Sequence, residues 1–470
     1  MDDRAAIEAA LAEAEAEGRR AADPDTCFER AALLAALGRD DAAKAAYLEV
    51  LARDEGHFGA LTNLGALALA SGHRSAALSC YRQTVASHPL SAPARVNLAN
   101  LLLEDGALVE AREHYAAALS VEPDLAGAHQ GLGLLLFALG DDEVADVHWR
   151  KGFESRSLVP KPYRGEGPPV RVLLLVSARG GNIPTGLILD DKLFAVTALY
   201  AEFHEVARPL PAHDVVFNAV GDAELCGEAL AGAKAVLART TAPVINPPED
   251  VAPTNRAANA TRLASIRGLR TPRIVRATKA TLLADPDLEF PALLRSLGFH
   301  TGQNFVRVEE RSNLAVACAA LPGRELLAIQ PLDARGTDGL HRKYRVMMID
   351  GALYPLHMAA SRDWKVHYFT AGMAERPDLR AEEQAFLERM PDVLGPRAMT
   401  ALAAVQRQMG LDYAGIDFGL SRQGEALLFE ANATMAIVPP EASPIWDYRR
   451  HPIDRALKAA QDMLKRRAAA

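Results

Sequence analysis

Apolar and small residues recur every 34 residues in the first third of the chain. The repeats start at Pro24, Phe58, Ala92 and Ala126. In each, position 8 is alanine or glycine, position 15 glycine and position 20 alanine, and position 24 is aromatic: Tyr47, Tyr81, Tyr115 and Trp149. Small residues let two helices approach, glycine permits a left-handed turn, and the aromatic fills the space towards the next repeat. The pattern predicts four helix hairpins.

This pattern resembles the tetratricopeptide repeat family over about residues 24–157, within a domain expected to span 1–157. The resemblance implies a right-handed superhelix of helix pairs whose concave face binds a peptide or protein segment. The first and last repeats lack the proline that closes the middle ones at Pro89 and Pro123, as capping repeats often do. Asn63, Asn97 and Asn100 either face this groove or are ordinary exposed polar residues.

The hydrophobic pattern changes after a proline- and glycine-rich segment, for which we expect a linker at 158–169. Continuous apolar runs start at Val170, Asp214 and Pro243 and alternate with helical stretches. They predict a small open α/β sheet over 170–250. The loop at 179–182 and the loop at 221–222 are either its ligand-binding edge or plain turns.

The segment from residue 251 onwards predicts a helix with Arg256 near its start, then a strand that ends at Arg295. A loop containing Gly298, His300, Thr301 and Gly302 follows, and then a second strand. A glycine-bearing loop directly after a cationic strand suits a lid over phosphate, because backbone N–H groups and a guanidinium can both approach the oxygens.

Residues 411–435 read as two short apolar strands joined by a polar turn at 421–424. Asp417 lies on the first strand, and Glu430 and Asn432 lie on one face of the second. Three oxygen donors facing one space would suit Mg²⁺. The alternative is an ordinary hairpin with polar residues on its solvated face.

Composition narrows the class of protein. The 470 residues, 49% hydrophobic and 24% charged, fit a soluble chain of two to four domains. Residues 1–155 carry 25 acidic and 13 basic side chains, which argues against a nucleic-acid partner. No apolar run is long enough for a bilayer. The four cysteines are isolated, so we expect no disulfide, no zinc site and a cytoplasmic location.

The order of these parts resembles the ATP-grasp superfamily, of the D-alanine ligase and glutathione synthetase type, over about residues 170–467. The magnesium motif is written here as IDF followed by FEAN. The fold class implied is an all-α repeat superhelix, a small α/β substrate domain at 170–250 and an α+β ATP-grasp fold at 251–470. The latter would have a lid-bearing part at about 270–325 and a metal-binding part at about 326–467.

The resemblance also implies roles for single residues. Asp417, Glu430 and Asn432 would hold two Mg²⁺ ions on ATP. Arg256 and Arg295 would contact the phosphates where relatives carry lysine, a replacement that keeps the charge but changes the donor geometry. Further expected ATP contacts are His300, Thr301 and Gly302 in the lid, and Gln330, Leu332 and Asp333 at the adenine and ribose. Arg345 and Arg362 would act on the transferred phosphate.

The function implied is an ATP-dependent carboxylate–amine ligase that works through an acyl phosphate, with the repeat array recruiting a peptide or protein. Two alternatives stay open. One is an interaction scaffold whose ATP-grasp domain binds nucleotide without ligation, and the other is a phosphotransferase of the same superfamily.

Overall fold

The computed structural model describes residues 3–18, 23–154, 156–205, 207–298 and 302–469. The chain forms two compact units. The first comprises Met1–Arg171 with Asp190–Phe203, and the second comprises Val172–Leu189 with His204–Ala470.

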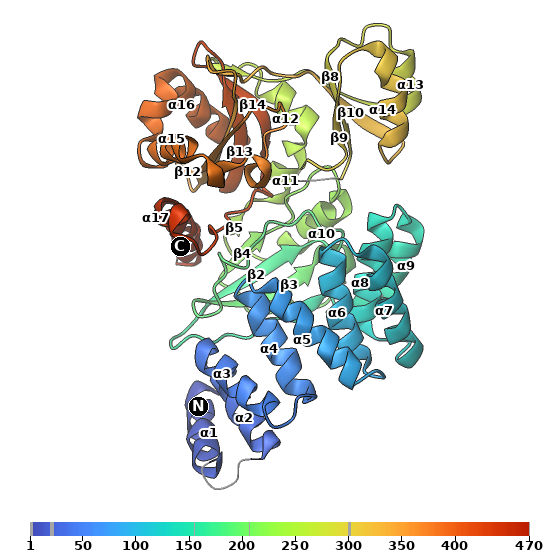
Figure 1. Cartoon of the computed structure of the whole chain (residues 1–470), viewed down its shortest axis with the longest axis vertical. Helices are drawn as coiled ribbons and strands as arrows, with labels where there is room; N and C mark the ends of the chain where they lie inside the picture. Colours follow the sequence, from blue (N-terminus) through green and yellow to red (C-terminus); the bar gives the residue numbers. More distant parts are fainter. Residues whose placement is uncertain (1–2, 19–22, 155, 206, 299–301, 470) are drawn as a thin grey trace. The chain divides into compact units, whose positions relative to one another are not determined.

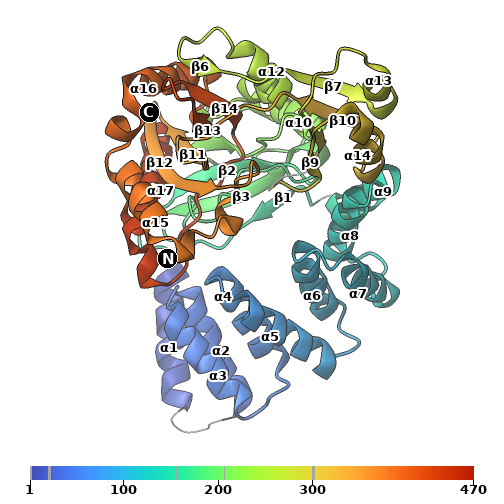
Figure 2. The ribbon, with the colours of Figure 1, turned by 45° about the horizontal axis from the view of Figure 1, so that its top comes forward.

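The first unit is mainly an array of helix pairs, drawn from dark blue to cyan in Figure 1 and visible pair by pair in Figure 2. Helix α1 spans Asp3–Gly18. The pairs that follow are α2 (Pro24–Ala36) with α3 (Asp40–Leu51), α4 (Phe58–Ala70) with α5 (Arg74–Ser87), α6 (Ala92–Glu104) with α7 (Leu108–Val121), and α8 (Ala126–Ala138) with α9 (Asp142–Phe153). The first helix of each pair begins where a repeat was predicted to start. The 34-residue hairpin repeat is therefore confirmed.

The glycine at position 15 ends the first helix of every pair in a left-handed conformation. The φ angles are 69°, 78°, 76° and 84° at Gly38, Gly72, Gly106 and Gly140. Residues with a Cβ rarely adopt such angles, so glycine at this position directs the chain into the second helix.

The aromatic residue at position 24 packs on the small residue at position 8 of its own hairpin. A Cβ at Gly65 would lie 2.7 Å from the ring of Tyr81, and one at Gly133 would lie 2.6 Å from the indole of Trp149. Tyr115 also touches the next repeat, because a Cβ at Gly131 would lie 2.3 Å from its ring. The small positions thus make room for aromatic rings as well as for the helix backbones.

Gly133→Ala is expected to destabilise the protein by about 1–3 kcal/mol, because the added methyl group would overlap a buried indole. Gly127→Ala, in the same helix, is the control. Its Cβ would lie 3.4 Å from Val96, an ordinary contact, and alanine favours helix, so stability should rise slightly. Urea denaturation of both variants measures the difference. Equal effects would contradict the packing described for Trp149.

Two of the asparagines predicted to face a groove hydrogen-bond to tyrosines of the array. The Asn63 amide donates to Tyr47 Oη at 3.0 Å, and Tyr115 Oη donates to Asn100 Oδ1 at 2.6 Å. These two side chains therefore join neighbouring helices. Among the described residues, Asn97 makes no such bond to a tyrosine.

The predicted linker begins with a short strand. β1 (Leu158–Pro160) pairs antiparallel with β3 (Phe194–Tyr200), which is followed by the 3-10 turn η1 (Ala201–Phe203). Phe153, at the end of α9, packs on Tyr200 and Phe203 with ring centroids 4.2 and 5.0 Å apart. Segment 190–203 therefore belongs with the helical array.

The predicted parallel strands lie in the second unit, apart from the first two residues of β2. β2 (Val170–Val176), β4 (Val215–Asn218) and β5 (Val244–Ile245) pair in parallel, with α10 (Gly227–Leu237) between the last two. The short α11 (Pro248–Val251), η2 (Ala252–Thr254) and α12 (Arg256–Arg262) lead out of this sheet.

A four-stranded antiparallel sheet follows, which we call the lid sheet. Its order is β7 (Ile274–Thr278), β10 (Glu325–Ile329), β8 (Ala292–Ser296) and β9 (Phe305–Val308). Helices α13 (Lys279–Ala284) and α14 (Leu314–Ala320), with η3 (Arg311–Asn313), cover one face (Figure 1). Leu294 and Leu326 point into that core, whereas Leu293, Arg295 and Ile329 line a cavity on the other face.

The C-terminal sheet has the order β12 (Ala352–Ser361), β11 (His341–Ile349), β13 (Tyr413–Leu420), β14 (Ala426–Asn432) and β6 (Leu269–Arg270). The predicted hairpin at 411–435 is thus confirmed as β13 and β14. Helices α15 (Pro377–Glu388) and α16 (Met390–Met409) belong to this part, with the turns η4 (Tyr368–Thr370), η5 (Met373–Glu375) and η6 (Pro444–Arg449). Tyr344 and Phe418 stack on the face that meets Phe386 of α15.

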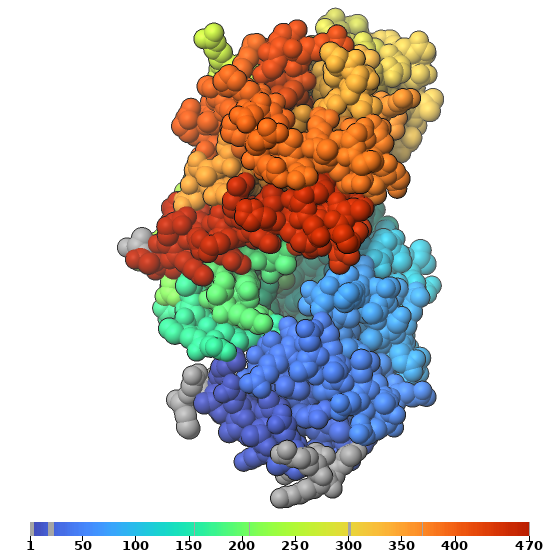
Figure 3. Space-filling view, turned by 60° about the vertical axis from the view of Figure 1, so that its left-hand side comes forward, coloured from blue at the N-terminus to red at the C-terminus, as the bar shows by residue number. Residues whose placement is uncertain are grey.

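Helix α17 (Arg450–Ala468) packs its apolar face on β11 and β12. The red atoms of the C-terminal segment form a continuous surface band in Figure 3. Within the described residues, every helix is too short or too polar to cross a membrane.

Candidate functional site

A cavity of about 1280 Å³ lies within the second unit and is lined by both the lid sheet and the C-terminal sheet. Nine arginine and lysine side chains and five aspartate and glutamate side chains line it among the described residues. Apolar walls come from residues such as Leu293, Ile329 and Phe429. This excess of cations suits an anionic ligand with an apolar part.

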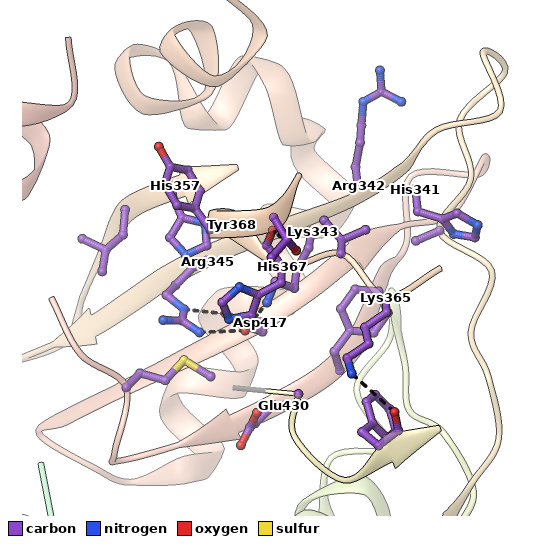
Figure 4. A pocket seen from close by; sticks show the side chains of 18 of the residues that line it. His341, Arg342, Lys343, Arg345, His357, Lys365, His367, Tyr368, Asp417 and Glu430 are labelled. Carbon is purple, nitrogen blue, oxygen red and sulfur yellow. Dashed lines mark hydrogen bonds and ion pairs between the residues drawn. The ribbon is translucent and has the colours of Figure 1, made fainter. Parts of the chain in front are cut away.

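Four polar side chains form one row across the C-terminal sheet. His357 on β12 is opposite Arg345 on β11, Arg345 is opposite Asp417 on β13, and Asp417 is opposite Glu430 on β14. All four line the cavity, and Figure 4 shows them from close by. Residues far apart in the sequence thus meet because the strand register aligns them.

Asp417 is buried beneath two cations, which Figure 4 joins to it by dashed lines. Arg345 donates from Nε and Nη2 at 2.7 and 2.9 Å, and Lys343 donates from Nζ at 3.2 Å. Burial alone would raise the pKa of the Asp417 carboxyl, but the Arg345 and Lys343 charges outweigh it and hold the pKa well below its usual range. Asp417 is therefore ionised.

Glu430 contacts two other predicted site residues, Arg256 and Asn432. Its carboxylate accepts a hydrogen bond from Arg256 and one from the Asn432 amide, the latter at 2.7 Å. Arg256 also pairs with Glu224 at 3.8 Å, and its backbone N–H donates to the same carboxylate at 3.1 Å. The predicted residues Arg256, Glu430 and Asn432 therefore lie together.

Arg295 lies on the cavity face of β8, with its guanidinium 5.4 Å from the centroid of the Phe305 ring. Burial, together with the neighbouring Arg256 charge, lowers the pKa of Arg295 to about 10. Arg256 and Arg295 line the same cavity, and an anion bound there would stabilise both charges.

The segment predicted to meet adenine and ribose also lines the cavity. Gln330, Leu332 and Asp333 are all lining residues. The Gln330 side chain accepts from the Arg273 backbone N–H at 3.3 Å. A hydrogen bond from Arg335 lowers the pKa of Asp333 to about 2, so this carboxylate is ionised and can accept a hydroxyl donor.

Residues 299–301 of the lid loop, and with them His300 and Thr301, lie outside the described residues. Gly302 lines the cavity against Lys365, whose Nζ donates to the Phe305 carbonyl at 3.4 Å. Phe305 and Trp364 meet edge to face with centroids 5.2 Å apart. These contacts join the lid sheet to the segment after β12.

Arg362 does not share the position of Arg345. It is exposed and is not among the residues that line the cavity. The structure instead adds residues that the sequence did not single out: Lys343, His357, Trp446 and Arg449. The spacing of Lys343 and Arg345, two apart on a strand, is the signal that could have found the first of them.

Asp417, Glu430 and Asn432 offer two carboxylates and one amide oxygen on neighbouring strands of one sheet, and all three line the cavity; oxygen is the ligand type that Mg²⁺ prefers. Within the described residues, no group of three or more His, Cys, Asp and Glu side chains could hold a metal. The predicted ligand set contains only two residues of these four types, Asp417 and Glu430, because its third member, Asn432, is an amide.

Comparisons with known proteins give partial matches. Solved structures similar to this chain include a double mutant titled MamA RS-1 ArsTM (28% identity, 32% of this chain and 84% of that one, TM-score 0.29). A MamA segment from Desulfovibrio magneticus RS-1 is similar at 27% identity, over 32% of this chain and 86% of that one, with a TM-score of 0.29. No protein-family model matches the chain, and no curated protein sequence matches it.

Proposed function

We propose that this protein is an ATP-dependent ligase that joins a carboxylate to an amine, with the repeat array recruiting a peptide or protein. One observation carries the proposal: the row His357–Arg345–Asp417–Glu430 shares a cavity with Arg256 and Arg295. Ionised carboxylates and several cations in one partly apolar cavity suit a nucleotide triphosphate and its metal.

In this proposal Arg256 and Arg295 bind the phosphates, and the segment from Gln330 to Asp333 receives the nucleoside. Asp417, Glu430 and Asn432 would hold Mg²⁺, which disperses charge on the phosphates when bound. Asp417 and Glu430 would hold the metal through carboxylate oxygens that now accept from Arg345 and Arg256. Those guanidiniums would then be available to phosphate oxygens.

The reaction would proceed in two displacements. A substrate carboxylate oxygen attacks the γ-phosphorus and ADP leaves, which gives an acyl phosphate. An amine then attacks the acyl carbon and releases phosphate and a proton. Arg345 and Lys343 would stabilise the negative charge that develops beside Asp417, and the contacts of Phe305 with Trp364 would exclude water.

ADP release tests the proposal. The full chain is mixed with ATP, Mg²⁺ and pools of carboxylic acids and primary amines. ADP formation that needs one member of each pool, with a condensed product by mass, supports ligation. ATP binding without ADP formation in any pool would favour the scaffold, and ADP formation with a phosphorylated product would favour the phosphotransferase.

Arg295→Ala is expected to weaken ATP binding roughly tenfold to a hundredfold, because a charge-assisted hydrogen bond in a buried site contributes about 1.5–3 kcal/mol. Arg276→Ala on β7 is the control, since that side chain is exposed and pairs with Glu325. Titration calorimetry with ATP and Mg²⁺ compares the two. Equal affinities would exclude Arg295 from the nucleotide site.

A further inference from the structure

The two cations beside Asp417 carry more positive charge than this single carboxylate can balance. Lys343 and Arg345 both pair with this carboxylate, so the three side chains carry one net positive charge. Their exposed fractions are 16% for Lys343, 23% for Arg345 and 6% for Asp417. Within the described part of the chain, Lys343 has no second carboxylate at ion-pair distance. Since an uncompensated charge away from water is costly, this place favours an added anion.

His357 adds a donor at the same place. Its side chain is 8% exposed and lines the cavity, and its Nδ1 has no hydrogen-bond partner among the described residues. Burial, assisted by the Arg345 charge, lowers the pKa of His357 well below its ordinary value, so the ring is neutral. A neutral imidazole carries one N–H, which can donate to an anion. Most buried polar atoms in folded proteins have a hydrogen-bond partner, so the Nδ1 of His357 leaves one hydrogen bond open to a ligand or a water.

We infer that Lys343, Arg345 and His357 form a second anion subsite that binds the carboxylate of the substrate. The inference deepens the proposed function and rests on it for the reaction. Asp417 on β13 separates this subsite from Glu430 on β14, and two strand spacings amount to about 10 Å. The subsite for the substrate carboxylate and the part of the cavity lined by Arg256 and Arg295 are thus separate.

The walls next to this subsite indicate what the carboxylate is attached to. Tyr368 lies with its ring centroid 5.0 Å from that of His357. The guanidinium of Arg449 covers the rings of Tyr368 and Trp446, at 4.2 and 5.9 Å from their centroids, and pairs with the buried Glu383 at 3.4 Å. Arg449 is therefore already charge-balanced, and the aromatic walls suit an apolar or aromatic acid.

Calorimetric titration with simple probes tests the subsite. Benzoate and acetate serve as carboxylates, and benzylamine and methylamine serve as matched cations, each added to the full chain with Mg²⁺ and ADP. Benzoate is expected to bind more tightly than acetate, and neither amine is expected to bind. Lys343→Met should weaken benzoate at least about tenfold, because it removes a charged donor. His357→Phe, which keeps the ring shape, should weaken it as well.

Lys458→Met is the matched control, because this exposed lysine on α17 pairs with Asp462 and removing it changes the net charge equally. It should leave benzoate binding and ADP binding unchanged. Unchanged benzoate affinity in both cavity variants, or binding of amines alone, overturns the subsite. Benzoate binding that depends on Lys343 in a chain that binds no ADP would overturn the proposed function and leave the subsite standing.

Discussion

Asp417→Asn is expected to destabilise the protein by about 3–5 kcal/mol at neutral pH, because removing one partner of a buried ion pair leaves the other charge uncompensated. Here two cations, Arg345 and Lys343, would lose their shared counter-ion. Urea denaturation at pH 7 measures the loss. Asp378→Asn is the control, since its pair with Arg376 is exposed and such pairs contribute little.

The pH dependence of this difference has a definite sign. The folded-state pKa of Asp417 lies below its unfolded value, so its contribution is fully present above the unfolded pKa, about 4, and is lost as pH falls. The gap between the natural chain and Asp417→Asn should therefore narrow as the pH is lowered below about 4. A gap that is constant with pH would mean that the carboxylate is not held in its ionised form by Arg345 and Lys343.

Local patterns predicted much of the fold. The hairpins follow from glycines such as Gly38 and aromatics such as Tyr115 at fixed offsets, because each acts within its own turn or helix pair. The β13–β14 hairpin follows from two apolar runs around a polar turn. β1 could not be read this way, because its partner β3 lies beyond β2 in the chain and nothing in residues 158–160 specifies that pairing.

The site could be predicted only where chemistry and spacing are local. Glu430 and Asn432 are two apart on one strand, so their shared face is evident from the sequence. His357 meets Arg345 through the register of β11 and β12, which contains an irregularity directly after Arg345. Because of this register shift, the regular spacing of residues along a strand does not predict that His357 lies opposite Arg345. The buried pair of Glu383 and Arg449 likewise depends on how α15 and η6 pack.

Glu430→Gln separates function from stability. It removes one of the two carboxylates proposed to hold the metal, and ADP formation should fall by about a hundredfold or more, as for other groups that stabilise charge in the transition state. The fold should lose less than in Asp417→Asn, because Arg256 keeps Glu224 as a counter-ion. ADP release, measured with the substrates that support it in the natural chain, and urea denaturation together test both parts.

Glu425→Gln is the control for this prediction, because it makes the same chemical change at the residue directly before β14. Glu425 pairs with Arg270 and Arg397 and does not line the cavity. Its loss should leave ADP formation unchanged. Equal activity in the two variants would remove Glu430 from the metal site and, with it, the main support for a nucleotide in this cavity. A loss confined to Glu430→Gln, with the fold intact, would require its carboxylate for the chemistry itself.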